Sequence, residues 1–261
     1  MQPRRLGEGL ELLRAWFGCR AFSRHRHDTY AVGVTEAGVQ TFDYRGRVEH
    51  STPGQVVVLH PDEQHDGRPG TEGGFGYRIV YVDPARIGAA VAALQGGPPQ
   101  LPFVRDPVVD DATLGAAVRE AFELPDEPLA RDALVLRLAQ RLARIDRSMP
   151  APRPCRLDRP ALARARALLD ARLDVVRSTE LEAITGLSRW ELARQFRACH
   201  GTSPYRYSLL RRLTAARRWL EQGAAPGEAA LLTGFADQPH FTRMFRSAYG
   251  VTPGRYLAWL R

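Results

Sequence analysis

Three histidines in the first quarter of the chain have a spacing that could bind a metal ion or a small polar ligand. His25 and His27 are two residues apart, so in an extended segment their imidazoles lie on the same face. His65 follows the apolar run at residues 56–59. Neutral imidazole suits zinc and iron alike. Three interpretations stay open: histidines in an effector pocket or at its rim, a three-histidine metal site, and purely structural histidines.

Short β-strands must position these histidines. Residues 30–34 alternate between apolar and small side chains, 55–59 and 75–82 are apolar runs, and 44–47 has the composition of a tight turn. Closely spaced short strands with Gly and Pro turns predict a small barrel or jelly roll. Candidate effector-binding residues are His25, His27, Tyr30, His65 and Tyr77.

Helices and a linker are predicted after the strands. Residues 84–95 end at a Gly pair, 112–124 follow two aspartates that can cap a helix, and 129–147 carry a leucine stripe. That stripe either covers the barrel or pairs with a second copy of the chain, which would give a homodimer. Residues 148–154 contain three prolines within five positions, which hold such a segment extended.

A fourteen-residue motif occurs twice near the C-terminus. Residues 194–207 align on 243–256 at a fixed offset of 49, and seven of the fourteen positions are identical. Each copy has a Gly where an amphipathic helix should stop, followed by a Pro. Two similar arginine-rich modules suit a ligand that has its own repeat. DNA, whose successive major grooves are about 34 Å apart, is that kind of ligand.

Composition separates the two halves of the chain. Residues 155–261 contain 18 Arg against nine acidic residues, a formal charge of +9, whereas residues 1–154 carry −1. All 37 basic residues of the 261-residue chain are Arg, which favours bidentate contacts to phosphate and guanine. A neutral half joined to a basic half is typical of a sensor joined to a polyanion-binding domain.

Other classes of protein are disfavoured. Three scattered cysteines give neither a disulfide framework nor a cysteine zinc site. The uncharged stretch 87–104 contains Gly-Gly-Pro-Pro and is not a membrane-spanning helix. No apolar run follows the N-terminal arginines, so no signal peptide is expected. We expect a cytoplasmic protein without membrane contact.

The C-terminal motifs resemble those of a known family. Residues 186–197, followed by Gly-x-Ser-Pro at 201–204, resemble the first helix-turn-helix of AraC-type transcription regulators. Residues 234–246, followed by 250–256, resemble the second and more diagnostic one. The resemblance extends over residues 158–261. It implies sequence-specific binding to double-stranded DNA, contact with RNA polymerase, and activation more often than repression.

The histidine segments resemble the cupin domain that many AraC-type regulators carry as an N-terminal effector domain. A metal-binding cupin has a Glu a few residues past its histidine pair, whereas Ala31 and Val32 occupy that stretch here and the nearest Glu is Glu36. We therefore predict no cofactor and no catalytic residues. The metal site formed by His25, His27 and His65 remains the less favoured alternative.

Helical spacing divides each DNA-reading helix into a core face and an exposed face. Arg can bind guanine and Gln can bind adenine through two hydrogen bonds each. A linker helix at 205–222, roughly 27 Å long, resembles the one that sets the family's two reading helices about one DNA turn apart. Ser178, Glu182 and Pro226 depart from the family pattern. The predicted DNA-contacting residues are Arg189, Trp190, Ala193, Arg194, Arg197, Gln238, Pro239, His240, Thr242 and Arg243.

Together these features predict a two-domain α+β protein. Residues 1–147 form a cupin-like β-barrel with trailing helices, 148–157 a Pro-rich linker, and 158–261 an all-α domain of two helix-turn-helix units joined by a linker helix. The predicted function is a DNA-binding transcription regulator, and an activator, controlled by a small molecule in the barrel. The alternative is a cupin-type metal-dependent enzyme with an incidental basic helical domain. DNA-repair proteins that share the helical module would need a metal-binding cysteine cluster, which the chain lacks.

Overall fold

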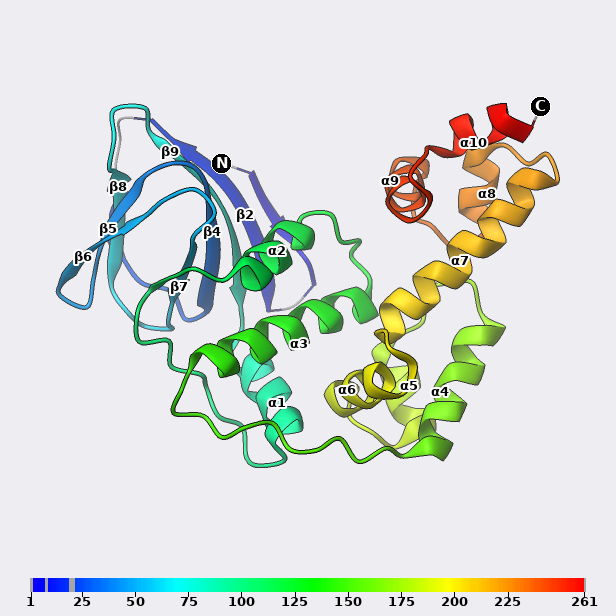
Figure 1. Ribbon diagram of the computed structural model, residues 1–261, viewed down its shortest axis with the longest axis horizontal. Coiled ribbons are helices and arrows are strands. Elements are labelled where there is room, and N and C mark those ends of the chain that lie inside the picture. Colours follow the sequence, from blue (N-terminus) through cyan, green and yellow to red (C-terminus); the bar gives the residue numbers. More distant parts are fainter. Residues whose placement is uncertain (1, 8, 19–21, 261) are drawn as a thin grey trace. The chain divides into compact units, whose positions relative to one another are not determined.

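The computed structural model describes residues 2–7, 9–18 and 22–260 and contains two compact units (Figure 1). One unit comprises residues 1–126 and 131–154, and the other comprises 127–130 and 155–261. The first is rich in strands and the second is helical, which confirms the predicted two-domain α+β fold. Cys19 lies outside the described residues.

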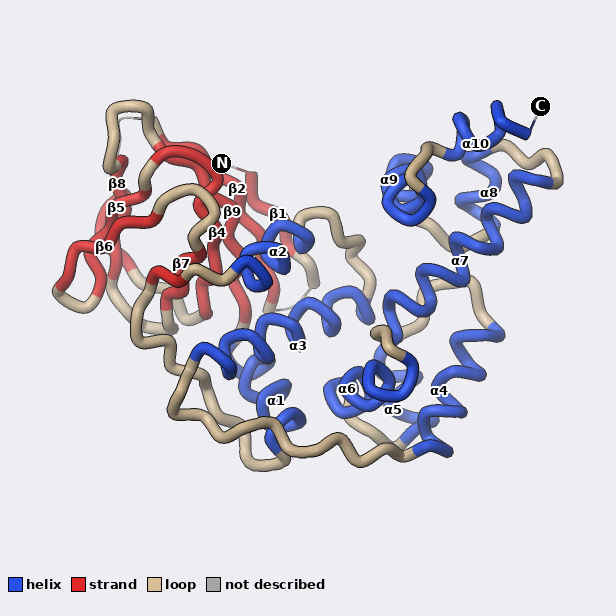
Figure 2. Tube along the Cα trace, in the orientation of Figure 1, coloured by secondary structure: helices blue, strands red, loops and turns tan. Residues whose placement is uncertain are grey.

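The strands of the first unit form two antiparallel sheets (Figure 2). The order is β1-β2-β9-β4-β7-β10 in the larger sheet and β3-β8-β5-β6 in the smaller one. The two sheets are not closed into one continuous barrel. The strands are β1 Gln2–Arg5, β2 Leu10–Phe17, β3 Phe22–His25, β4 Tyr30–Gly38, β5 Gln40–Tyr44, β6 Arg47–Ser51, β7 Val56–Leu59, β8 His65–Pro69, β9 Phe75–Val82 and β10 Val108–Val109.

The core of this unit includes side chains from both sheets. Phe42 and Tyr44 of the smaller sheet pack in one cluster with residues of β2, β4, β7 and β9, among them Ala31 and Ile79. Every residue from 30 to 35 of β4 is buried, because the other face of this strand is covered as well. The strand is therefore buried on two sides, where alternation alone suggested one.

The predicted turn at residues 44–47 and two of the predicted strands are present in the structure. Tyr44 pairs with Arg47, and Arg45 and Gly46 both have positive φ, at 48° and 77°, as a two-residue hairpin turn of type I′ requires. The runs at 55–59 and 75–82 are β7 and β9. Strands β1 and β2 precede the predicted strand region and were missed by the pattern.

Three helices accompany the strands: α1 Pro84–Gln95, α2 Ala112–Ala121 and α3 Pro128–Ile145. Gly96 ends α1 in the left-handed conformation, and the Asp111 side chain caps α2 by accepting a hydrogen bond from the Leu114 N–H. The first part of the Pro-rich segment contacts α1, since Gln95 donates to the carbonyl of Pro150 over 3.2 Å. This part of the predicted linker therefore belongs to the strand-rich unit.

The helical unit contains two similar halves that share a long helix, α7 (Figure 1). Helix α7 packs against α4 and α6 on one side and against α8, α9 and α10 on the other. The predicted linker helix is therefore also a structural element of both modules. The helices are α4 Arg159–Ala171, α5 Ser178–Thr185, α6 Arg189–His200, α7 Pro204–Glu221, α8 Pro226–Leu232, α9 Gln238–Tyr249 and α10 Pro253–Leu260.

The repeated motif has a repeated local structure. Ser188 caps α6 and Asp237 caps α9, each by accepting a hydrogen bond from a backbone N–H of its own first turn. Gly201 and Gly250 end these helices with φ of 72° and 79°. Each pair is 49 residues apart, so the offset found in the sequence is also the offset of the helix ends.

Candidate nucleic-acid interface and effector cavity

The strand-rich unit contains a small, partly open cavity of about 240 Å³. Most of its wall is apolar or aromatic, and the polar groups are three histidines, two tyrosines and one glutamine. Such a wall with a few convergent polar groups is typical of a site for a small organic molecule. The lining residues are Leu13, Phe17, Phe22, His25, His27, Gly33, Gln40, Val57, Leu59, His65, Tyr77, Ile79 and Tyr81.

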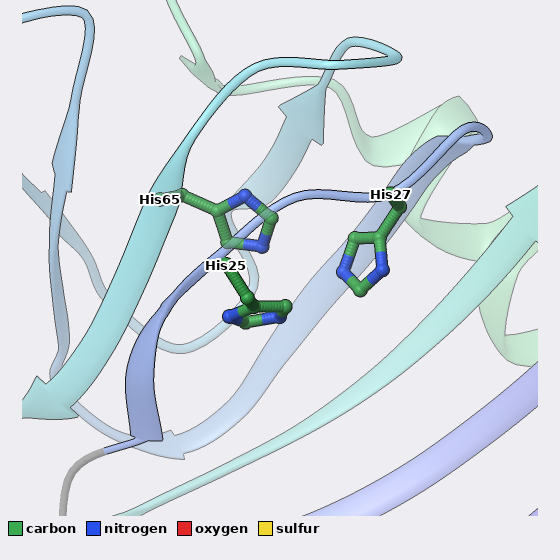
Figure 3. Close-up of side chains that lie close together, drawn as sticks. All are labelled: His25, His27 and His65. Carbon is green, nitrogen blue, oxygen red and sulfur yellow. The ribbon is translucent and has the colours of Figure 1, made fainter.

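The three histidines predicted from sequence meet in this wall (Figure 3). His25 of β3 and His65 of β8 are directly opposite each other in an antiparallel pair, and their ring centroids are 4.5 Å apart. The ring of His27 is 4.7 Å from that of His25 and 5.1 Å from that of His65. A backbone hydrogen bond from Asp62 to the carbonyl of His27, 2.7 Å long, joins the two chain segments.

Burial shifts the pKa values of four ionisable groups in the wall. Desolvation lowers the pKa of His65 to about 4, and it also lowers the pKa of His27, where the neighbouring His25 adds to the effect. Burial raises the pKa of Tyr81 to about 12 and the pKa of Tyr77 above its ordinary value. Burial therefore favours the neutral forms of His27, His65, Tyr77 and Tyr81 near pH 7.

Tyr30 does not line this cavity. Its hydroxyl donates to the carbonyl of Pro102 over 2.8 Å, while Ala31 packs in the core cluster and Gly33 lines the cavity. Because successive side chains of a strand point to opposite faces, Tyr30 lies on the wrong face of β4. Its inclusion among the effector-binding residues is a prediction that the structure does not support.

The same period-two rule places Tyr77 and Tyr81 of β9 together in the wall, and applying it to β9 would have found Tyr81 from sequence.

A larger and more open groove adjoins the cavity. It has a volume of about 680 Å³ and is lined by the first two strands and by residues 27–29. Leu13, His27 and Tyr81 line both spaces, so they lie between the groove and the cavity. The rings of His27 and Tyr81 meet edge to face at 4.9 Å.

In the helical unit, helix α6 exposes fewer of its predicted DNA-contacting residues than expected. Trp190 is 7% exposed and Ala193 is 6% exposed, so the expectation that they form an outward surface is wrong. Both positions lie on the side of α6 that packs inward. Arg197 is exposed and Arg194 is half-buried.

Arg189, at the start of α6, is bound by a carboxylate of its own module. Its Nη2 and Nε lie 2.9 and 3.1 Å from the Glu182 carboxylate, and its backbone N–H donates to the same group over 2.8 Å. Burial alone would raise the pKa of Glu182, but the hydrogen bonds and charge of Arg189 lower it overall. The Glu182 carboxylate therefore stays ionised beside Arg189.

Helix α9 presents a more open face. Gln238, Pro239 and Arg243 are exposed and Thr242 is half-buried. His240 is only 4% exposed and its ring packs against Phe235 at 5.4 Å, so it belongs to the core of the module and not to the exposed face. Arg246 is exposed as well and was missed, although the repeat places it 49 residues after Arg197.

The arginines of α7 have mostly structural partners. Arg212 is 1% exposed and donates to the carbonyls of Thr233 and Gly234. Arg211 pairs with Asp170 at 3.0 Å, and Arg217 pairs with Glu221 four residues later. Arg218 is exposed.

These two sites define a class of protein. A basic helical unit with two helix-turn-helix modules, joined in one chain to a strand-rich unit with a partly open cavity, is the architecture of a ligand-responsive DNA-binding regulator. Among the described residues, no helix combines the length and the apolar content needed to cross a bilayer.

Comparison with known proteins agrees with that class. The model of the AraC-like ligand binding domain matches residues 9–140, and a helix-turn-helix domain model matches residues 181–258. The HTH-type transcriptional regulator YbfI of Bacillus subtilis, which is itself uncharacterized, is 29% identical over 229 residues, covering 84% of this chain and 81% of YbfI. The chain belongs to the AraC family of transcription regulators.

Two solved structures are also similar. An AraC-type transcriptional regulator of Chromobacterium violaceum is 31% identical, with a TM-score of 0.36, over 39% of this chain and 92% of that chain. A variant of ToxT from Vibrio cholerae, in its apo form, is 13% identical, with a TM-score of 0.43, over 99% of this chain and 100% of that chain.

Proposed function

We propose that this regulator is a transcription activator whose binding to DNA, or recruitment of RNA polymerase, is controlled by a small molecule in the cavity of the strand-rich unit. The observation that carries the DNA side of this proposal is the repeated exposure of arginine on α6 and α9. Arg197 and Arg246 occupy equivalent positions 49 residues apart, and Arg243 adds a third guanidinium on α9. Exposed guanidinium groups that recur on two helix-turn-helix modules suit phosphates and guanines in two successive major grooves.

The cavity supports a small and largely apolar effector. Its wall is formed by Phe, Leu, Val, Ile and Tyr side chains, with the three histidines as the main polar group. Such a ligand can change the output only if it binds two states of the protein with different affinity. The leucine stripe of α3 is buried within the chain, since Leu134, Leu138 and Leu142 are at most 1% exposed, so a homodimer would have to form through another surface.

The alternative of a cupin-type enzyme has less support. The nearest glutamate to the histidine pair, Glu36, forms ion pairs with Arg78 at 2.9 Å and Arg119 at 3.0 Å. It is therefore engaged away from the three imidazoles, which leaves the cluster without the carboxylate that a metal-binding cupin uses. We propose a regulator in the cytoplasm with no catalytic residues.

The salt dependence of DNA binding tests this proposal. With the full chain and a random duplex, log K should fall with log salt by about 0.9 for each phosphate neutralised. Arg197→Ala and Arg246→Ala should each reduce this slope by about 1. Arg47→Ala removes the same charge from an exposed position on β6 and is the matched control, which should leave the slope unchanged. Affinity that hardly changes between low and physiological salt would contradict DNA as the partner.

A further inference from the structure

The three cavity histidines have converging ring nitrogens. His25, His27 and His65 each have a ring nitrogen within 4.8 Å of a ring nitrogen of the other two. Figure 3 shows the three imidazoles turned toward a common space, with two of them on neighbouring strands and His27 on the segment that follows β3. This arrangement places three potential ligand atoms around one point in an otherwise mainly apolar wall.

Hydrogen bonds fix the tautomer of two of the rings. Nδ1 of His25 lies 2.8 Å from the carbonyl oxygen of Ser23, and Nδ1 of His65 lies 3.1 Å from that of Glu63. A carbonyl oxygen only accepts, so each Nδ1 carries the ring proton and each Nε2 keeps its lone pair. Donation of the second ring nitrogen to a carbonyl is the usual support of a metal-bound histidine, because it orients the ring and raises its basicity.

Among the described residues that line the cavity, none supplies a cation for these lone pairs. Neither an arginine nor a carboxylate is among the residues that line the cavity. Gln40, Tyr77 and Tyr81 are its other polar groups. Three imidazoles whose ring nitrogens converge on one point suit a divalent transition-metal ion.

We propose that His25, His27 and His65 bind one divalent transition-metal ion, best matched by Zn²⁺, whose remaining coordination position faces the cavity. Tetrahedral zinc holds nitrogen ligands at about 2.0–2.1 Å, so ligand nitrogens are roughly 3.3 Å apart. The rings must therefore approach one another by up to about 1.5 Å from the present separation. His27 can supply this movement because it belongs to a loop and is only half-buried.

Three neutral ligands leave the full charge of the ion uncompensated. The cavity side of the ion would then favour an anionic group of the effector, such as a carboxylate, held against the apolar wall. This second part rests on the proposed function, since it identifies the chemical class of the controlling molecule. The site differs from a four-ligand cupin centre because Ala31 is a fully buried core residue where that centre has its glutamate.

The test uses the full chain, stripped of metal by a chelator and then titrated with CoCl₂, whose absorption reports a tetrahedral site. We expect one equivalent to bind and ZnCl₂ to displace it. His27→Ala and His25→Ala should each weaken Co²⁺ binding by at least 100-fold, and azide, a small anion, should shift the absorption of the wild-type complex. His50→Ala is the matched control, because His50 is exposed on β6 and bonds only Thr41 among the contacts described.

The proposal is overturned if Co²⁺ binds weakly and equally to the wild-type protein, the His27→Ala variant and the His50→Ala variant. Far-UV circular dichroism confirms that each variant is folded, and the conservative His27→Gln variant replaces His27→Ala if that one unfolds. DNA affinity is measured on the same samples. Absent metal binding with intact DNA binding rejects only the metal site, whereas intact metal binding without DNA binding rejects only the proposed function.

Discussion

The two helix-turn-helix modules are built on the same plan but start their reading helices differently. The plan extends further than the motif in the sequence: Thr185 ends α5 as Thr233 follows α8, and each donates its hydroxyl to a carbonyl four residues earlier over 2.6 Å. These threonines are 48 residues apart, as are Gly186 and Gly234, whereas the helix caps are 49 apart. The second module therefore has one extra residue between the glycine and the cap.

The first residues of α6 and α9 also make different contacts. In the first module Glu182 reaches Arg189, and Trp190 is buried. The position equivalent to Glu182 in the second module is Ala230, which is 2% exposed and has no group that could engage Gln238 by charge. A shared motif therefore does not ensure a shared surface. In the first module Arg189 pairs with a carboxylate of the same module, whereas in the second module Gln238 is exposed.

The modules also differ in the burial of the arginine that binds the backbone carbonyls at the turn between the two helices of each helix-turn-helix. Arg164 of α4 donates to the carbonyls of Ile184 and Thr185, and Arg212 of α7, 48 residues later, donates to those of Thr233 and Gly234. Arg164 is exposed, whereas Arg212 is fully buried and stacks on the ring of Phe235 at 4.4 Å. One contact repeated at two degrees of burial should have two different energies.

The largest expected effect tests this difference in burial. Arg212→Ala leaves two buried carbonyls without their donor, removes the contact with Phe235 and leaves the Glu127 carboxylate, 2.8 Å from Arg212, without its partner. We therefore expect the free energy of unfolding to fall by about 2–4 kcal/mol. Arg164→Ala removes the equivalent contact at the surface and should cost less than about 1 kcal/mol. Urea unfolding of the full chain, with hydrogen exchange followed in residues 226–260, measures both. Equal losses in the two variants would mean that burial does not distinguish the modules.

The next effect concerns DNA reading. Arg243→Ala should weaken binding to an operator selected from random DNA by about 1–3 kcal/mol, or roughly 5- to 150-fold, if Arg243 binds a base edge. Arg194→Ala is the equivalent change in the first module. It should have the smaller effect, because Arg194 is half-buried where Arg243 is exposed. Fluorescence anisotropy on the operator and on random DNA separates base contact from phosphate contact, since only a phosphate contact lowers both affinities alike.

Sequence reasoning succeeded where one local rule decides the structure. The Gly96 end of α1, the Asp111 cap of α2 and the turn at Arg45-Gly46 follow from backbone preferences of single residues. The meeting of His25 with His65 was predictable because a period-two strand and a partial family resemblance pointed to the same place. Such features depend on a few neighbouring residues, so they can be predicted from the sequence without the tertiary structure.

Sequence reasoning failed where a neighbouring element decides the outcome. Tyr30 was assigned to the cavity because its strand alternates, but β4 is buried on both faces and the pattern could not show which face the cavity adjoins. Trp190 and His240 were assigned to the surface from helical position alone, and packing against the rest of their modules buries them. The Glu182–Arg189 pair has its two members in different helices, so neither residue by itself indicates it.

The smallest expected effect probes that pair directly. Glu182→Ala makes the first module resemble the second, since Ala230 is the equivalent residue, and it removes a negative charge from beside the predicted DNA surface. Arg189 can then approach a phosphate, so random-duplex affinity should rise by about 0.5–1 kcal/mol and the salt slope should steepen by up to about 1. Glu228→Ala, which removes the same charge from an exposed position on α8, controls for net charge. Thermal unfolding checks that loss of the 2.8 Å bond to the Arg189 N–H leaves α6 folded. If Glu182→Ala weakens DNA binding in a folded protein, Glu182 holds Arg189 in position for DNA, and the first module reads DNA through its ion pair.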